Sequence, residues 1–173
     1  MNHSIKTGQF FKQENLVKAL DRAKETNGRL HLLGLVSDGG VHSHINHLFA
    51  LLEAAKNAGV QETYVHFFGD GRDTSPTSGV NYLQQLLDKF KELGYGKLGT
   101  VIGRYYAMDR DKRWERTKIA FQALTKGEGQ KGEDPIKDVK AKYDKDENDE
   151  FLKPIVYNRP EADIRGDSYL GHN

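Results

Sequence analysis

The sequence predicts an α/β fold of three layers, in which helices cover both faces of a mainly parallel sheet. Three observations lead to this prediction. Apolar runs of strand length alternate with amphipathic stretches of helix length, which is the order of elements in parallel crossovers. The runs are nearly continuous, as in strands that are buried on both faces. Each run ends in a polar segment that contains glycine, and such segments meet at the carboxyl ends of the strands of an open sheet.

Hydrophobic periodicity, with glycine or proline at the ends, predicts the elements up to residue 125. In order, they are a helix over 16–26, a strand over 30–36, a helix over 43–57, a strand over 63–68, a helix over 77–93, a strand over 98–102 and a helix over 112–125. Pro76 is expected as the first residue of the third helix, with Ser75 as its N-cap, because proline suits the first helical turn.

The C-terminal part is less periodic. Residues 127–132 are rich in glycine and are expected to form a loop, and Asp134-Pro135 is expected to open a short helix that ends near Tyr143. The acidic run 144–150 is interpreted as a solvated loop, because it has nothing to bury and lacks the pattern of a calcium loop. A strand over 151–157 is expected at a sheet edge because it contains Pro154. Residues 158–173 show no periodicity and are expected to be a divergent, disordered tail.

Composition limits the class of protein. A chain of 173 residues is long enough for one domain with a real core. The formal net charge of +1 indicates no bulk electrostatic partner, neither nucleic acid nor an anionic membrane. The absence of cysteine excludes disulfides and thiolate metal sites. No run approaches the ~18 apolar residues of a membrane span, and the first residues lack the apolar stretch of a signal peptide, so the protein is predicted to be cytoplasmic.

The polar segment after the first strand, LVSDGGVHSH, has two chemical interpretations. Gly39 and Gly40 allow the backbone to approach a ligand, and the helix that starts after them favours an anion, with His42 as a hydrogen-bond donor. Asp38, His42 and His44 are also metal-ligand types. Residues two apart on a helix diverge by about 200°, which argues against two histidines on one ion. A purely structural turn remains the third interpretation.

The next two segments, FFGDGRDTSP and VIGRYYAMDRDKR, contribute arginine side chains at the same edge of the predicted sheet. Arg72 offers a planar fork to a phosphate or carboxylate, and Asp73 can orient an arginine or accept a proton from a hydroxyl. The structural alternative is an Arg–Asp pair that pins the loop. Arg104 and Arg110 can face the same crevice, whereas Arg116 is expected to lie in solvent. Together these residues predict a site for a small, multiply anionic substrate.

The segments SDGGVHSH, GDGRDTSP and GRYYAMDRDKRW resemble motifs of the cofactor-independent phosphoglycerate mutase family, in the family's order and spacing. The resemblance implies a parent enzyme with a phosphatase-like domain, which holds two manganese ions and a serine nucleophile, and an inserted phosphotransferase domain. Only the phosphotransferase domain is represented here, over residues 1–157. It is expected to be incomplete at its C-terminal end, because Arg159 and Arg165 do not have the spacing of the family's paired-arginine motif.

By motif, the resemblance implies substrate-binding roles for His42, Arg72, Asp73, Arg104 and Arg110, and for Asp73 also the role of a catalytic base. The implied reaction is the interconversion of 3-phosphoglycerate and 2-phosphoglycerate in glycolysis and gluconeogenesis. This chain alone is expected to be inactive and to hold no metal or other cofactor. Its expected partner is the phosphatase-like domain of the same enzyme. Two alternatives stay open: a non-catalytic module that binds phosphate or another anion, and a metal hydrolase.

Overall fold

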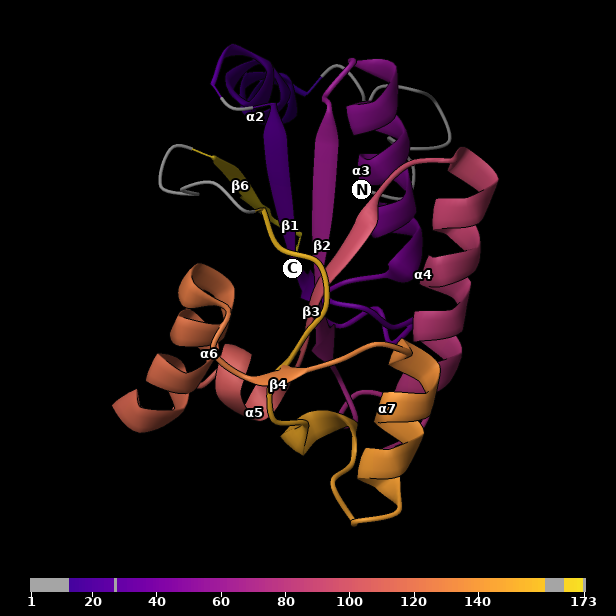
Figure 1. The fold of residues 1–173 in the computed structure, drawn as a ribbon, viewed down its shortest axis with the longest axis vertical. Helices are drawn as coiled ribbons and strands as arrows, with labels where there is room; N and C mark the ends of the chain where they lie inside the picture. The colour runs from indigo at the N-terminus through magenta and orange to yellow at the C-terminus, as the bar shows by residue number, and fades with distance from the viewer. Residues whose placement is uncertain (1–12, 27, 161–166, 173) are drawn as a thin grey trace.

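Strands and helices alternate along the described residues, 13–26, 28–160 and 167–172, in a computed structural model. In chain order the elements are α2 (Glu14–Glu25), β1 (Arg29–Leu35), α3 (Ile45–Asn57), β2 (Glu62–Gly69), α4 (Gly79–Leu93), β3 (Lys97–Gly103), α5 (Arg104–Ala107), α6 (Trp114–Lys126), β4 (Gln130–Lys131), α7 (Pro135–Tyr143), η2 (Asp149–Phe151), β5 (Ile155–Val156) and β6 (Ser168–Gly171). The strands form one sheet in the order β4-β5-β3-β2-β1-β6 (Figure 1). None of the helices in this part of the chain is long and apolar enough to cross a membrane.

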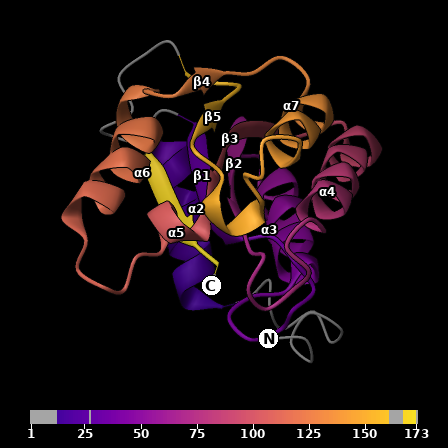
Figure 2. The same cartoon turned by 90° about the horizontal axis from the view of Figure 1, so that it is seen from below.

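Helices cover both faces of the sheet, so the predicted three-layer α/β class is confirmed. Figure 2 shows α3, α4 and α7 on one side and α5 and α6 on the other. On the side of α3 and α4 the apolar faces of the helices pack on the strands and form the main core, with Leu32, Leu48, Leu52 and Leu83 fully buried. Beneath α6 the core is a small cluster around Ile102.

The parallel centre of the sheet consists of β1, β2 and β3, as the apolar runs predict. The register pairs Leu35 with Phe68 and Gly69 with Gly103. The three carboxyl ends therefore lie side by side, and the polar segments that follow them share one edge of the sheet.

The predicted N-cap of α4 is wrong. The helix begins at Gly79, and the Ser78 side chain donates to the Ser75 carbonyl in the turn before it. The first helical N–H instead donates to the Asp149 carboxylate, 2.7 Å away, so the cap comes from a distant segment. The helix predicted over 112–125 begins later, at Trp114, because Lys112 has a φ of 56°, outside the helical region.

Three predictions for the C-terminal part are also wrong. The loop over 127–132 contains the short strand β4. The strand predicted over 151–157 is reduced to β5, which lies between β4 and β3 and runs antiparallel to β3, so it is not an edge strand. The acidic run is not fully solvated, since its last residues form η2 and Asp149 is buried. The helix predicted from Asp134-Pro135 to Tyr143 is confirmed as α7, and Asp134 caps it.

The disorder predicted for residues 158–173 is wrong at β6, which pairs in parallel with β1. Residues 161–166, including Arg165, lie outside the described residues. β6 is held by the edge of β1 and by Asp167, whose carboxylate accepts from Arg29 Nε at 2.8 Å and lies 2.8 Å from His31 Nε2. These partners are about 140 residues away in sequence, so local periodicity could not show them.

Candidate functional site

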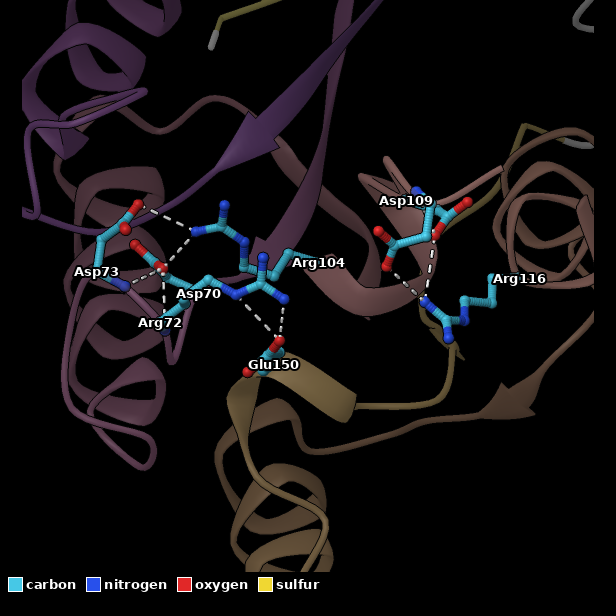
Figure 3. A network of polar contacts seen from close by, with 8 residues as sticks. Asp70, Arg72, Asp73, Arg104, Asp109, Arg116 and Glu150 are labelled. Carbon is cyan, nitrogen blue, oxygen red and sulfur yellow. Dashed lines mark hydrogen bonds and ion pairs between the residues drawn. The ribbon is translucent and has the colours of Figure 1, made fainter. Parts of the chain in front are cut away.

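A buried ion-pair cluster lies at the carboxyl ends of β2 and β3. Asp70 directly follows Gly69, the last residue of β2, and Arg104 directly follows Gly103, the last residue of β3. Arg104 Nη1 lies 2.9 Å from Asp70 Oδ1 and 3.0 Å from Asp73 Oδ2 (Figure 3). Arg104 is only 5% exposed and Asp70 only 3%. One buried cation is therefore shared by two carboxylates.

Asp70 organises the loop that follows β2. Its carboxylate accepts from Ser37 Oγ at 2.8 Å and from the backbone N–H groups of Arg72 and Asp73 at 3.2 and 3.0 Å. Burial by itself raises the pKa of Asp70, but these donors and Arg104 outweigh it, so the pKa lies below its usual value. The charged carboxylate is thus held in place by donors from three strand ends.

Asp73 and His42 form the accessible side of the cluster. His42 Nε2 lies 3.8 Å from Asp73 Oδ2, the oxygen that also contacts Arg104. The side chains of His42 and Asp73 are 40% and 18% exposed, so both can reach a ligand from solvent. A carboxylate beside a fixed cation and an exposed imidazole can bind or deprotonate a substrate hydroxyl.

The two remaining predicted residues are placed differently. The side chain of Arg72 turns to Glu150, with Nε 3.1 Å from Oε1, so it does not form the Arg–Asp pair of the structural alternative. Arg110 is exposed and forms no ion pair with the described residues. The structure thus links His42, Asp73 and Arg104 directly, and links Arg72 to them through the Asp70 turn.

The prediction that Arg116 lies in solvent is wrong. Its Nη1 lies 3.2 Å from Asp109 Oδ1 (Figure 3), and its guanidinium stacks over the Tyr105 ring at 3.9 Å. The ion pair connects α6 to the segment between α5 and α6, on which Arg110 lies.

The metal-site interpretation of the first loop is not supported. Asp38 accepts a hydrogen bond from Tyr82, and His44 Nδ1 accepts from the backbone of Asn46 as the N-cap of α3. His42 faces Asp73 instead. Among the described residues, no three His, Asp or Glu side chains are grouped so that they could hold a metal ion.

Sequence reasoning missed Asp70, Ser37, Asp149 and Glu150. An aspartate directly after a buried strand is a signal for a hydrogen-bonded loop, and this signal could have found Asp70. Asp149 and Glu150 were assigned to the solvated acidic run. Nothing local shows their role at the site, because the partners that they have there, Gly79 and Arg72, lie about 70 to 80 residues away.

Asp149 is the most perturbed carboxyl group near the site. It is 1% exposed, and it accepts hydrogen bonds from the Gly79 N–H and the Tyr143 hydroxyl. Burial is the main influence and raises the pKa of Asp149 to about 6, since these two donors compensate only in part and the nearby Asp70 charge adds to the rise.

Titration of Asp149 is expected to make the folded state less stable as the pH rises, whereas His66 and His172 act in the opposite direction because burial lowers their pKa values. Asp149 releases its proton near pH 4 in the unfolded chain and near pH 6 in the folded chain, so the folded state binds more protons between these values. The contribution of Asp149 to the free energy of unfolding should therefore fall as pH rises through this window, by up to about 3 kcal/mol. Asp149→Asn cannot titrate, so urea unfolding at pH 4 and pH 6.5 should show a change in the free energy of unfolding that is more positive than in the wild type by up to this amount.

Asp144→Asn changes an exposed aspartate at the end of α7 and serves as the control. It should keep the wild-type dependence on pH. Equal changes in the free energy of unfolding for wild type and Asp149→Asn would contradict the assignment.

Comparison with known proteins agrees with this fold. The model of the BPG-independent PGAM N-terminus family matches residues 1–173. The 2,3-bisphosphoglycerate-independent phosphoglycerate mutase of Caenorhabditis elegans is 54% identical over 173 residues, which cover 98% of this chain and 32% of that protein. The enzyme of that name from Moorella thermoacetica is 48% identical and is covered over 34% of its length.

A solved structure shares the same architecture. The crystal structure of Leishmania mexicana phosphoglycerate mutase at low cobalt concentration has a TM-score of 0.90 and 25% sequence identity, and the match covers 99% of this chain and 34% of that one. The chain thus spans about a third of the length of these relatives. Since the family model matches its whole length, the chain belongs to the BPG-independent PGAM N-terminus family.

Proposed function

We propose that this chain is the substrate-binding phosphotransferase domain of a 2,3-bisphosphoglycerate-independent phosphoglycerate mutase, which interconverts 3-phosphoglycerate and 2-phosphoglycerate. The observation that carries the proposal is Arg104, buried between Asp70 and Asp73 where β2 and β3 end. Around this fixed cation, His42 and Arg72 reach solvent and can bind the phosphate and carboxylate of the substrate.

Each residue has a distinct task in this proposal. Arg104 is preorganised by its two carboxylates, so it can stabilise charge without rearranging. Arg72, Arg110 and His42 bind the anionic groups and keep the glycerate oriented between the two transfers. Asp73 takes the hydroxyl proton as that oxygen becomes bonded to phosphorus.

The serine nucleophile and the two manganese ions are proposed to belong to the rest of the enzyme. The described residues offer no suitable cluster of metal ligands, so no step on this chain is assigned to a metal. The boundary of the domain at residue 157 and the cytoplasmic location remain predictions.

A non-catalytic module that binds anions is the second candidate, favoured by the accessible side chains of His42, Arg72 and Arg110 at the site. A turnover assay separates the two candidates. The chain alone should not convert 3-phosphoglycerate, whereas the chain supplied with the phosphatase-like domain of a relative should. Binding without turnover in both mixtures would favour the binding module.

Weak binding of phosphoglycerate to the isolated chain is the direct test of the site. We expect a Kd on the order of millimolar, with NMR shifts confined to the loops after β1, β2 and β3. Arg110→Ala removes a charge-assisted contact worth roughly 1.5–3 kcal/mol, so binding should weaken at least about tenfold. The double variant Arg104→Ala, Arg110→Ala should no longer bind phosphoglycerate.

Arg22→Ala is the matched control, because Arg22 is an exposed arginine in the last turn of α2, whereas the loops of the site follow β1, β2 and β3. It should bind like the wild type. Shifts elsewhere in the chain, or unchanged binding in the double variant, would place the site away from these loops.

A further inference from the structure

Among the described residues, Glu150 forms an ion pair with Arg72 at the site, and the proposed function gives it no task. We propose that Glu150 is a positioning residue of the anion site: it holds one edge of the Arg72 guanidinium so that the other edge faces the ligand. This inference rests on the proposed function and adds a residue to it.

The geometry of the ion pair shows which edge is used. Arg72 donates through Nε, at 3.1 Å, and through Nη2, and both bonds go to the same oxygen of Glu150, Oε1. A guanidinium carries five N–H groups in a fixed plane. The pair therefore leaves the Nη1–Nη2 edge, which suits two oxygens of a phosphate or carboxylate. The Arg72 side chain is 41% exposed, so this edge is accessible to a ligand.

Glu150 can position another side chain because its own backbone is fixed at the strand ends. The neighbouring Asp149 N–H donates to the Pro76 carbonyl at 2.9 Å, and the Gly103 N–H donates to the Leu152 carbonyl at 2.8 Å. A Cβ atom at Gly71 would lie 2.8 Å from the Glu150 nitrogen, so glycine permits this close approach. The segment is thus fastened to the loop after β2, which carries Arg72, and to the last residue of β3, which is followed directly by Arg104.

The contrary role is competition, in which Glu150 occupies Arg72 and a ligand must displace it. The observed contact favours positioning. Glu150 contacts only the Nε–Nη2 edge of the Arg72 guanidinium, and it does so with only one of its two carboxylate oxygens. Burial supports this, since the Glu150 side chain is 16% exposed and less free to move away than Arg72.

Glutamine and alanine at this position separate the two roles. Both remove the charge, but only glutamine keeps an oxygen that can accept from Nε and Nη2. We would titrate the full chain with inorganic phosphate at constant ionic strength and follow the amide signals and the Arg72 Nε–H signal by NMR. Glu150→Gln should bind phosphate about 3- to 10-fold more tightly than Glu150→Ala, the range expected for ordering one long side chain. The Arg72 Nε–H should be protected from exchange in wild type and Glu150→Gln, and unprotected in Glu150→Ala.

Two controls test the specificity of the effect. On an Arg72→Ala background the glutamine and alanine variants should bind equally. Glu53→Gln and Glu53→Ala remove the carboxylate of an ion pair between α3 and α4, where Lys89 Nζ lies 2.8 Å from Glu53, and should also equal each other.

The outcomes are distinguishable. One outcome overturns the positioning role and leaves the proposed function standing. In that outcome the wild type binds phosphate, and Glu150→Ala binds it as tightly as Glu150→Gln or more tightly. No phosphate binding by the wild type overturns the proposed function, and this inference with it.

Discussion

Replacing Asp73 with asparagine in a full-length mutase that contains this domain is expected to lower kcat by ~10²–10⁴-fold, while substrate affinity changes little. Asp73 is the carboxylate of the cluster that reaches solvent, and Arg104 and His42 lie beside the same oxygen, Oδ2. Its other oxygen is left to accept a proton. Asparagine keeps the shape and the contact with Arg104, but it cannot act as a base.

Steady-state kinetics together with single-turnover transfer provide the measurement. The alternative role for Asp73 is only to orient Arg104. In that case Asp73→Asn would mainly weaken substrate binding and leave single-turnover transfer intact. Asp88→Asn is the control, since Asp88 lies on α4 and accepts from Gln84 on the same helix. It should change neither quantity.

Replacing Arg104 with alanine is expected to lower the free energy of unfolding of this chain by about 3–5 kcal/mol. The change leaves the buried Asp70 carboxylate without its cation. Asp70 still accepts from Ser37 and from two backbone N–H groups, so the loss should lie near the lower end of this range.

Urea unfolding at neutral pH measures this loss, with Lys97→Ala as the matched control. Lys97 pairs with Glu62 at 3.1 Å, but both side chains are well exposed, so its removal should cost at most about 1 kcal/mol. Adding Asp70→Asn to Arg104→Ala should restore part of the stability, because the unpaired charge is then gone. An Arg104→Ala loss no larger than that of Lys97→Ala would mean that the cluster does not stabilise the fold.

The sequence by itself determined the central architecture. The apolar runs that became β1, β2 and β3, and the helical spacing that became α3 and α4, are local patterns, so they could be found without knowing what packs on them. The same locality placed Asp73 and Arg104 at one sheet edge, because parallel strands bring their carboxyl ends together.

Only the tertiary structure decided which charges meet there. The structural alternative paired Asp73 with its neighbour Arg72, but Asp73 contacts Arg104, and Arg72 contacts Glu150, which is 78 residues further along the chain. The buried Asp149 cap, the inner position of β5 and the strand β6 were likewise not predictable. The physical reason is common to all of them. Each depends on a partner far away in sequence, and the distance between such partners is set by the path of the folded chain, not by local composition or periodicity.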